Sequence, residues 1–357
     1  MPELTGIPLF TQSINLAHRE MRSEAPRQLY QEVFQNLYES KEASVRVEEL
    51  TGATEALRAV EDGQQSHVRQ YEAGTVKEYY PPISSEKKKI DARLRRSIIF
   101  GGSSNPGYDN MDQIIYNMLM GSKGFIAADE MEKNKAVIDL LDTGKFIKRD
   151  HLGIVDSFNF ERAAGNTFTY DYSGGSFDAM VKANYDLLKA QGAPVGNLAM
   201  IIGSSHFTKF EGDSTILSRI SAFQNMDTMK IMTEPYYNGV DGLTKIGTYK
   251  PNGMGVFVNI FIYNPKRQYK VVGSAAADFV GATKAYMFPM GDHSRCNLGI
   301  EVIDPMNPSN LVTRFGELVI TADTMADPAA KWIIARNNFF FAFNNINYTT
   351  CCTGTNF

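Results

Sequence analysis

The sequence predicts an α+β protein in which a charged arm and one long helix join a more ordinary set of strands and helices. Residues 41–97 are crowded with charge and have a thin apolar lining, and residues 109–143 place apolar residues at helical spacing. The remainder mixes helical and strand-like patterns. With 357 residues, 43% of them hydrophobic, the chain is large enough to fill a substantial core.

The first 40 residues are expected to form an extended lead over 5–16, followed by a short helix. Apolar residues recur at helical spacing after Pro26, namely Leu29, Val33, Phe34 and Leu37. The N-terminus has no basic region followed by an apolar stretch, and no run of about 18 apolar residues occurs. We therefore expect neither a cleaved leader nor a membrane span.

Residues 41–97 are expected to form two long strands that lack a core of their own. Their apolar lining consists of Val45, Val47, Val68, Tyr71, Val76 and Tyr79. Two strands without a third strand or a covering helix are marginal in water. The sequence therefore predicts that another subunit supplies the missing partners. A disordered insertion remains the alternative, because high charge with few aromatic residues is the usual composition of disorder.

The charges of this arm are unevenly placed. A basic block at 87–96 and three arginines before residue 28 are opposed by a surplus of carboxylates at 42–78. Such blocks often only solvate a surface, and a partner of opposite charge would make them informative. The residues expected to contact other subunits are Arg19, Arg22, Glu48, Glu49, Tyr71, Lys77, Lys87, Lys88, Lys89, Arg93 and Arg96.

A long helix is expected over 109–143. A turn-rich stretch at 101–107 precedes it, Asp109 can cap it, and Gly144 follows it. At about 1.5 Å per residue its length would be about 50 Å. Two glycines inside it, Gly121 and Gly124, predict a bend.

The remaining chain is expected to alternate strands with one further helix. Strands are predicted within 147–172, 198–202, 256–262, 269–272, 318–321 and 333–343, and the helix carries Phe177, Met180, Val181, Tyr185 and Leu188 on one face. The continuous apolar run at 198–202 is typical of a strand that is buried on both faces.

Charge and cysteine content limit the classes of function. A net charge of -4 excludes a strongly basic nucleic-acid binder, so any contact with nucleic acid should be local or loose. An odd number of cysteines, three, favours a reducing cytosol over a disulfide framework. We expect Cys351 and Cys352 to be unpaired buried thiols, with a strained disulfide or a metal site as the alternatives.

No catalytic, metal or cofactor motif occurs in the sequence. The five histidines show no metal-ligand spacing, and phosphate-loop, dinucleotide and hydrolase patterns are missing. The most enzyme-like stretch is 203–206, but adjacent residues of an extended chain point to opposite faces, so Ser205 and His206 would not meet. We interpret it as a turn. Three further carboxylates, Asp304, Asp323 and Asp327, fit turn chemistry better than a calcium loop.

The order of these parts resembles a known family. The stretches that carry the likeness are 39–50, 80–99, 255–260, 285–291 with the sequence Ala-Tyr-Met-Phe-Pro-Met-Gly, and 327–331 with Asp-Pro-Ala-Ala-Lys. Together they are similar to the major capsid protein of tailed bacteriophages, specifically the lambda-type capsid E family with the Hong Kong 97-type capsid fold. The likeness extends over nearly the whole chain, and its specificity comes from the order and spacing of these stretches.

The resemblance implies a division of the chain. It comprises an N-arm at 1–40, an extended E-loop at 41–97, a peripheral domain at 98–150 and 287–357 with its spine helix at 109–143, and an axial domain at 151–286. Some members link a loop lysine to an asparagine of another subunit, but no motif here identifies such a bond.

The implied function is a shell protein without enzymatic activity or cofactor. It would assemble as hexamers and pentamers into an icosahedral virion capsid around loosely and non-specifically held double-stranded DNA. It would be made in the host cytoplasm, away from membranes, and its partners would include a portal and, in some phages, scaffolding and decoration proteins. The alternatives are an encapsulin nanocompartment and an oligomeric α/β enzyme.

Overall fold

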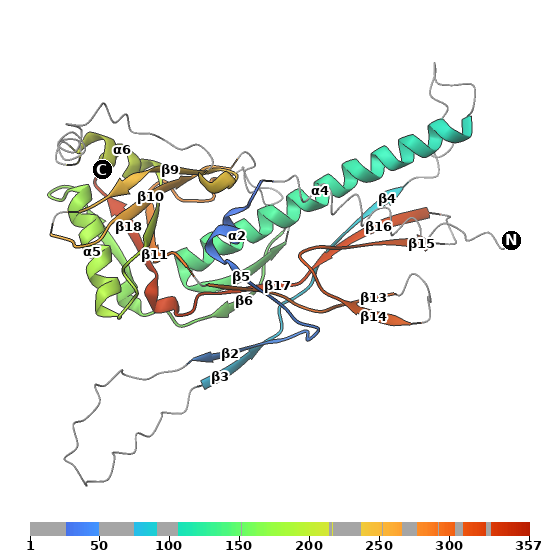
Figure 1. The fold of residues 1–357 in the computed structure, drawn as a ribbon, viewed down its shortest axis with the longest axis horizontal. Coiled ribbons are helices and arrows are strands. Elements are labelled where there is room, and N and C mark those ends of the chain that lie inside the picture. The colour runs from blue at the N-terminus through green and yellow to red at the C-terminus, as the bar shows by residue number, and fades with distance from the viewer. Residues whose placement is uncertain are drawn as a thin grey trace, which may run out of the picture.

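The computed structural model describes residues 26–49, 75–90, 106–150, 152–213, 216, 237–251, 253–265, 277–291, 293–303, 310–325 and 330–357. The molecule is elongated, with a compact part at one end and a long helix that projects from it (Figure 1). Two hairpins and a thin sheet also extend from the compact part.

The compact part is built on a six-stranded sheet. Its order is β7 (Thr167–Asp171), β18 (Thr350–Thr355), β11 (Lys284–Pro289), β8 (Leu198–Ile202), β10 (Val258–Tyr263) and β9 (Leu243–Tyr249). All five residues of β8 are buried, as its continuous apolar run predicted. The last strand, β18, returns to this sheet from the C-terminal end and pairs with β7 and β11.

Two apolar clusters cover the two faces of this sheet. Met200 of β8 contributes to a cluster with α5 (Phe177–Ala190) and α6 (Ser204–Gly212). Ile201 points to the other cluster, which contains the end of helix α4 (Pro106–Thr143) and an aromatic group. Since successive side chains of a strand point to opposite faces, β8 belongs to both cores.

The aromatic group joins the short helix α2 (Leu29–Val33) to a second layer of strands. Phe34 stacks on Phe341 at 5.0 Å between ring centroids, and Phe146 lies 4.9 Å from Phe340. The strands involved are β1 (Asn36–Glu39), β12 (Ser294–Asn297) and β17 (Phe339–Ala342), together with the hairpin of β5 (Lys145–Asp150) and β6 (Gly153–Asn159). These rings close the space between α4 and the sheet.

The thin parts of the molecule are antiparallel. Strands β15 (Val319–Met325), β16 (Ala330–Asn337) and β4 (Ser84–Ile90) form one sheet, and two-stranded pairs are formed by β13 (Ile300–Ile303) with β14 (Leu311–Arg314) and by β2 (Val45–Glu49) with β3 (Thr75–Tyr79). The sheet of β15, β16 and β4 runs beside α4 (Figure 1).

The long helix is confirmed, but the predicted cap is wrong, because Asp109 lies inside the helix. Helix α4 includes the whole expected span, begins three residues before it and continues through Gly121 and Gly124 as one element. Its 38 residues correspond to about 57 Å. Leu37 lies in strand β1 and is 42% exposed, so its assignment to the short helix was wrong. The strand expected at 269–272 lies outside the described residues.

Candidate assembly surface

The base of the predicted arm is anchored on its own subunit. Tyr79 of β3 is buried, its ring lies 5.2 Å from that of Phe158, and its hydroxyl donates to Asp156 Oδ2 at 3.0 Å. Burial and the neighbouring carboxylate raise the pKa of Tyr79. Val45 and Val47 pack against the same cluster. Tyr79 is therefore buried by its own subunit and the prediction that a neighbour covers it is wrong, whereas Val45 and Val47 are partly buried and their contact with another subunit stays a prediction.

Lys77 also contacts its own chain. Its Nζ lies 2.6 Å from Glu161 Oε1 in a partly exposed ion pair. In one chain Lys77 thus ties β3 to the segment that follows β6, and its predicted contact with another subunit stays a prediction.

The basic and acidic parts of the arm are separated in space. Lys87 and Lys88 are exposed on β4, where Lys89 also lies, whereas Glu48 and Glu49 end strand β2. The pair β2–β3 and strand β4 leave the centre of the molecule in opposite directions (Figure 1). One chain thus does not bring these two charge blocks together. The other residues expected here, Arg19, Arg22, Tyr71, Arg93 and Arg96, lie outside the described part of the chain.

Strand β4 is at the edge of its sheet. It pairs with β16 along one side, from Ser84 opposite Asn337 to Ile90 opposite Lys331. The Lys87 ammonium lies 5.0 Å from the centroid of the Trp332 ring across that pair. Lysines on an edge strand discourage indiscriminate strand pairing, and they also present positive charge to an acidic partner.

Large apolar side chains are exposed at three places along the thin parts. At the turn of β5 and β6, Leu152 and Ile154 are 69% and 61% exposed. Leu311 of β14 is 66% exposed, and Tyr80, between β3 and β4, is 62% exposed. Only the turn of β5 and β6 places several such residues together, since Val155 there is also 53% exposed, and contiguous exposed apolar residues mark surfaces that contact other proteins.

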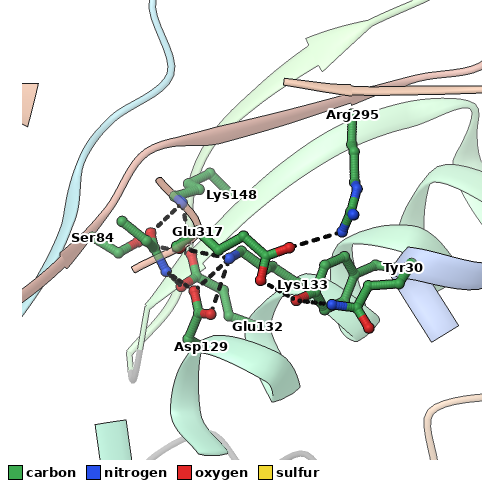
Figure 2. A network of polar contacts seen from close by, with 10 residues as sticks. Tyr30, Ser84, Asp129, Glu132, Lys133, Lys148, Arg295 and Glu317 are labelled. Carbon is green, nitrogen blue, oxygen red and sulfur yellow. Dashed lines mark hydrogen bonds and ion pairs between the residues drawn. The ribbon is translucent and has the colours of Figure 1, made fainter. Parts of the chain in front are cut away.

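A buried polar network fixes α4 against these strands (Figure 2). Lys133 of α4 is 2.9 Å from Asp129 and donates to the carbonyl of Glu317 at 2.7 Å. Glu132 accepts from Ser84 of β4 at 2.7 Å and lies 3.0 Å from the ammonium of Lys148 in β5. The network therefore sets the position of the strand that carries the arm lysines relative to the long helix.

The remaining members of the network reach the short helix. Arg295 Nη1 lies 2.9 Å from Glu317 Oε1, and the Tyr30 hydroxyl donates to Glu317 Oε2 at 3.3 Å. Burial lowers the pKa of Lys148, against the attraction of Glu132. None of these long-range contacts has a local signal in the sequence.

The stretch 203–206 begins helix α6 and is not a turn. His206 is fully buried, with Nδ1 at 2.8 Å from the Tyr172 hydroxyl and Nε2 at 2.9 Å from the carbonyl oxygen of Thr283. Burial lowers the pKa of His206. Both ring nitrogens are engaged by groups other than Ser205, so a serine–histidine pair does not form here.

The two adjacent cysteines are free and buried, as expected. Burial raises the pKa of the Cys351 and Cys352 thiols to about 12, which keeps both protonated and unreactive. Within the described ranges no cluster of three metal-ligating side chains is found, and no helix there is long and apolar enough to cross a membrane. Asp304 and Asp327 lie outside those ranges, as does the side chain of Asp323.

The structure resembles solved capsid proteins. A prophage protein from E. coli CFT073, assigned as a capsid protein, superposes with a TM-score of 0.59 over 97% of this chain and 99% of its own, at 12% identity. Weaker likenesses include the capsid of cyanophage P-SCSP1u, with a TM-score of 0.47, 8% identity and coverage of 93% and 89%. Another is the holo-SrpI encapsulin complex of Synechococcus elongatus PCC 7942, with a TM-score of 0.43, 8% identity and coverage of 89% and 84%.

The sequence itself matches no protein-family model and no curated protein. At 12% identity the first likeness is one of fold. This chain has the fold of that prophage capsid protein, the mixed α+β architecture of the Hong Kong 97 type that its sequence resemblance implied.

Proposed function

We propose that this chain is a major capsid protein that assembles into an icosahedral shell around phage double-stranded DNA. It fits the lambda-type capsid E resemblance, and its role is structural, without catalysis. Hexamers and pentamers of the chain would form the shell, built in the host cytoplasm and carried in the virion. A portal would complete the shell, and scaffolding or decoration proteins would join the shell in some phages.

The separation of the two charge blocks is the observation that carries this proposal. Strand β2, which ends in Glu48 and Glu49, and strand β4, which carries the lysines, extend in opposite directions in one chain, so a pairing of the two charge blocks would join two copies. A head-to-tail contact of this kind uses two different surfaces and forms rings where the rotation between copies closes. The exposed apolar residues Leu152, Leu311 and Tyr80 lie outside these two strands, and neighbouring subunits would cover them as well.

The domain division is part of the proposal. Residues 151–286 would form the axial domain around the symmetry axes, and 98–150 with 287–357 the peripheral domain around the α4 spine. Residues 1–40 and 41–97 would be the N-arm and the E-loop. DNA would be held loosely, because a net charge of -4 leaves few cations for tight phosphate binding.

Electron microscopy of the purified full-length protein tests the assembly. Closed icosahedral particles are expected, and a discrete small oligomer at every concentration and salt would contradict the proposal. Particles recovered from the natural host should protect double-stranded DNA from nuclease. Particles that enclose a protein cargo instead would identify an encapsulin-like compartment.

A charge exchange tests the contacts. Reversing Lys87 and Lys88 to Glu should reduce the particle yield, although each exposed pair contributes at most about 1 kcal/mol, because the shell repeats it in every subunit. Adding Glu48→Lys and Glu49→Lys to the same chain should restore assembly. Lys189→Glu, on the exposed face of α5, is the matched control and should assemble normally. Normal yield from the first variant would exclude these lysines as contacts.

A further inference from the structure

Three side chains from different parts of the chain meet in an arrangement that is suited to forming a bond. Lys148 Nζ lies 2.9 Å from Oδ1 of Asn337, the last residue of β16. Glu132 of α4 touches both groups: its Oε1 is 3.0 Å from Lys148 Nζ, and its Oε2 accepts from Asn337 Nδ2 at 3.0 Å. One carboxylate therefore bridges an amine and the amide nitrogen next to it.

The amine of Lys148 and the amide of Asn337 are shielded from water, which favours their reaction with each other. Lys148 and Asn337 are 1% and 3% exposed, and the Lys148 ammonium lies 3.6 Å from the centroid of the Phe339 ring. Asp129, also 3% exposed, accepts from Asn337 Nδ2 at 2.8 Å and so fixes the rotation of the amide. Burial lowers the pKa of Lys148, which makes it easier to form the neutral amine that acts as the nucleophile.

We propose that Lys148 and Asn337 form an intramolecular isopeptide bond, with Glu132 as the catalytic residue. The bond joins β5 to β16 within one subunit, 189 positions apart in the sequence. It is a single event in each chain, without turnover, and it differs from a link between subunits because all three side chains come from the same fold. Asp129 acts as a positioning residue.

The reaction needs no oxidant or co-reactant. Glu132 takes a proton from the Lys148 ammonium, and the lone pair that this frees on Nζ forms the new bond to Asn337 Cγ. The carbonyl π electrons move onto Oδ1 and return as the Cγ–Nδ2 bond breaks, and Nδ2 keeps the electron pair of that bond. Nζ loses two protons in all. Glu132 passes the first to Nδ2, so that ammonia leaves, and the second proton converts this ammonia into an ammonium ion. Glu132 ends as the carboxylate with which it began.

The same geometry also describes a buried ion pair that never reacts. Buried pairs with good hydrogen bonds persist in proteins. The two states differ in mass, because the isopeptide bond releases one ammonia of about 17 Da. The proposal is independent of assembly, since folding of one chain brings the three groups together.

Intact-mass measurement of the denatured full-length protein tests the proposal. We expect a mass about 17 Da below that of the sequence, with a branched tryptic peptide that joins the segments around Lys148 and Asn337. A folded protein of full sequence mass, with both residues recovered in separate linear peptides, would overturn it. Because this measurement uses the unaltered chain, it does not depend on whether any variant folds.

Variants then assign the roles. Lys148→Met and Asn337→Ala each remove one reacting group, and Glu132→Gln keeps the shape of the side chain but removes its proton-transfer capacity, so all three should retain their full calculated mass. Asn338→Ala alters the next residue, which is also buried, and should still lose ammonia. Mass loss in a folded Glu132→Gln protein would show that Glu132 is not the catalyst, and full mass in Asn338→Ala would contradict the assignment to Asn337.

Discussion

The compact sheet and the projecting half of this molecule are stabilised by different means. The sheet around β8 is buried by aliphatic and aromatic side chains on both faces. In contrast, every buried Asp, Glu, Lys or Arg side chain among the described residues lies on α2, α4 or β5. The projecting half is thin and holds only small apolar clusters, around Phe125 of α4 and around Ile300 of β13, and buried ion pairs lie beside them.

The two halves should therefore differ in the substitutions that they tolerate. An apolar core loses stability in proportion to the volume removed, whereas a buried pair loses it when one charge is taken away. Replacing a whole pair by apolar residues is often neutral. The pairs on α4 therefore fix geometry more than they add stability, which suits a helix that must hold strand β4 in one position.

The largest effect is expected from breaking one such pair. Asp129→Leu removes the carboxylate 2.9 Å from Lys133 Nζ and should reduce the free energy of unfolding by about 3–5 kcal/mol. Denaturation followed by fluorescence measures it, because the single tryptophan, Trp332, lies in β16 of the same half. The double variant Asp129→Leu with Lys133→Met should recover most of the loss. No recovery would show that the pair itself is needed for stability.

A comparable effect is expected in the compact sheet from an apolar deletion. Met200→Ala in fully buried β8 should reduce the free energy of unfolding by about 2–5 kcal/mol, because it leaves a cavity. Since β8 belongs to both cores, the transitions seen by far-ultraviolet circular dichroism and by Trp332 fluorescence should shift together. Separate shifts would show that the two halves unfold independently. Lys189→Ala on exposed α5 is the control and should change stability by less than about 0.5 kcal/mol.

The two halves also differ in how well the sequence predicted them. The apolar run of β8 and the helical period of α4 are local signals, and both elements were predicted. The contacts of Lys148 with Glu132 and Asn337 were not, because they join residues far apart in the sequence that follow no shared pattern. The hydrophobic period shows which face is buried but not which charge will be buried with it.

Two predictions failed for different reasons, one local and one long-range. The stretch 203–206 was interpreted as a turn because adjacent residues of an extended chain would not bring Ser205 and His206 together, whereas Gly203 in fact precedes a helix in the N-cap position. Tyr79 was assigned to a contact between subunits because its strand has little apolar lining. Its buried neighbour Phe158 comes from β6, which sequence spacing alone does not bring near.

A smaller, pH-dependent effect is expected at the junction of α6 and the sheet. Burial lowers the pKa of His206 below its ordinary 6.5, partly offset by the hydrogen bond to Thr283. Below pH 6.5 the unfolded chain therefore binds more protons than the folded one, so stability is full above that pH and falls as the pH decreases. His206→Asn should make unfolding free energy depend less steeply on pH between 6.5 and about 5. An unchanged slope would contradict a buried neutral imidazole.

The smallest effect separates an internal contact from one between subunits. Lys77 and Glu161 form an ion pair whose side chains are 31% and 64% exposed, and such pairs contribute at most about 1 kcal/mol. Lys77→Met should therefore change the free energy of unfolding by less than that, and Glu161→Gln should do the same without adding to it in the double variant. Particle yield should stay normal in all three, unlike the reversal of Lys87 and Lys88. A defect in assembly from Lys77→Met with unchanged stability would return Lys77 to the contacts between subunits that the sequence predicted, and would mean that its pair with Glu161 is exchanged for one with a neighbour when the shell forms.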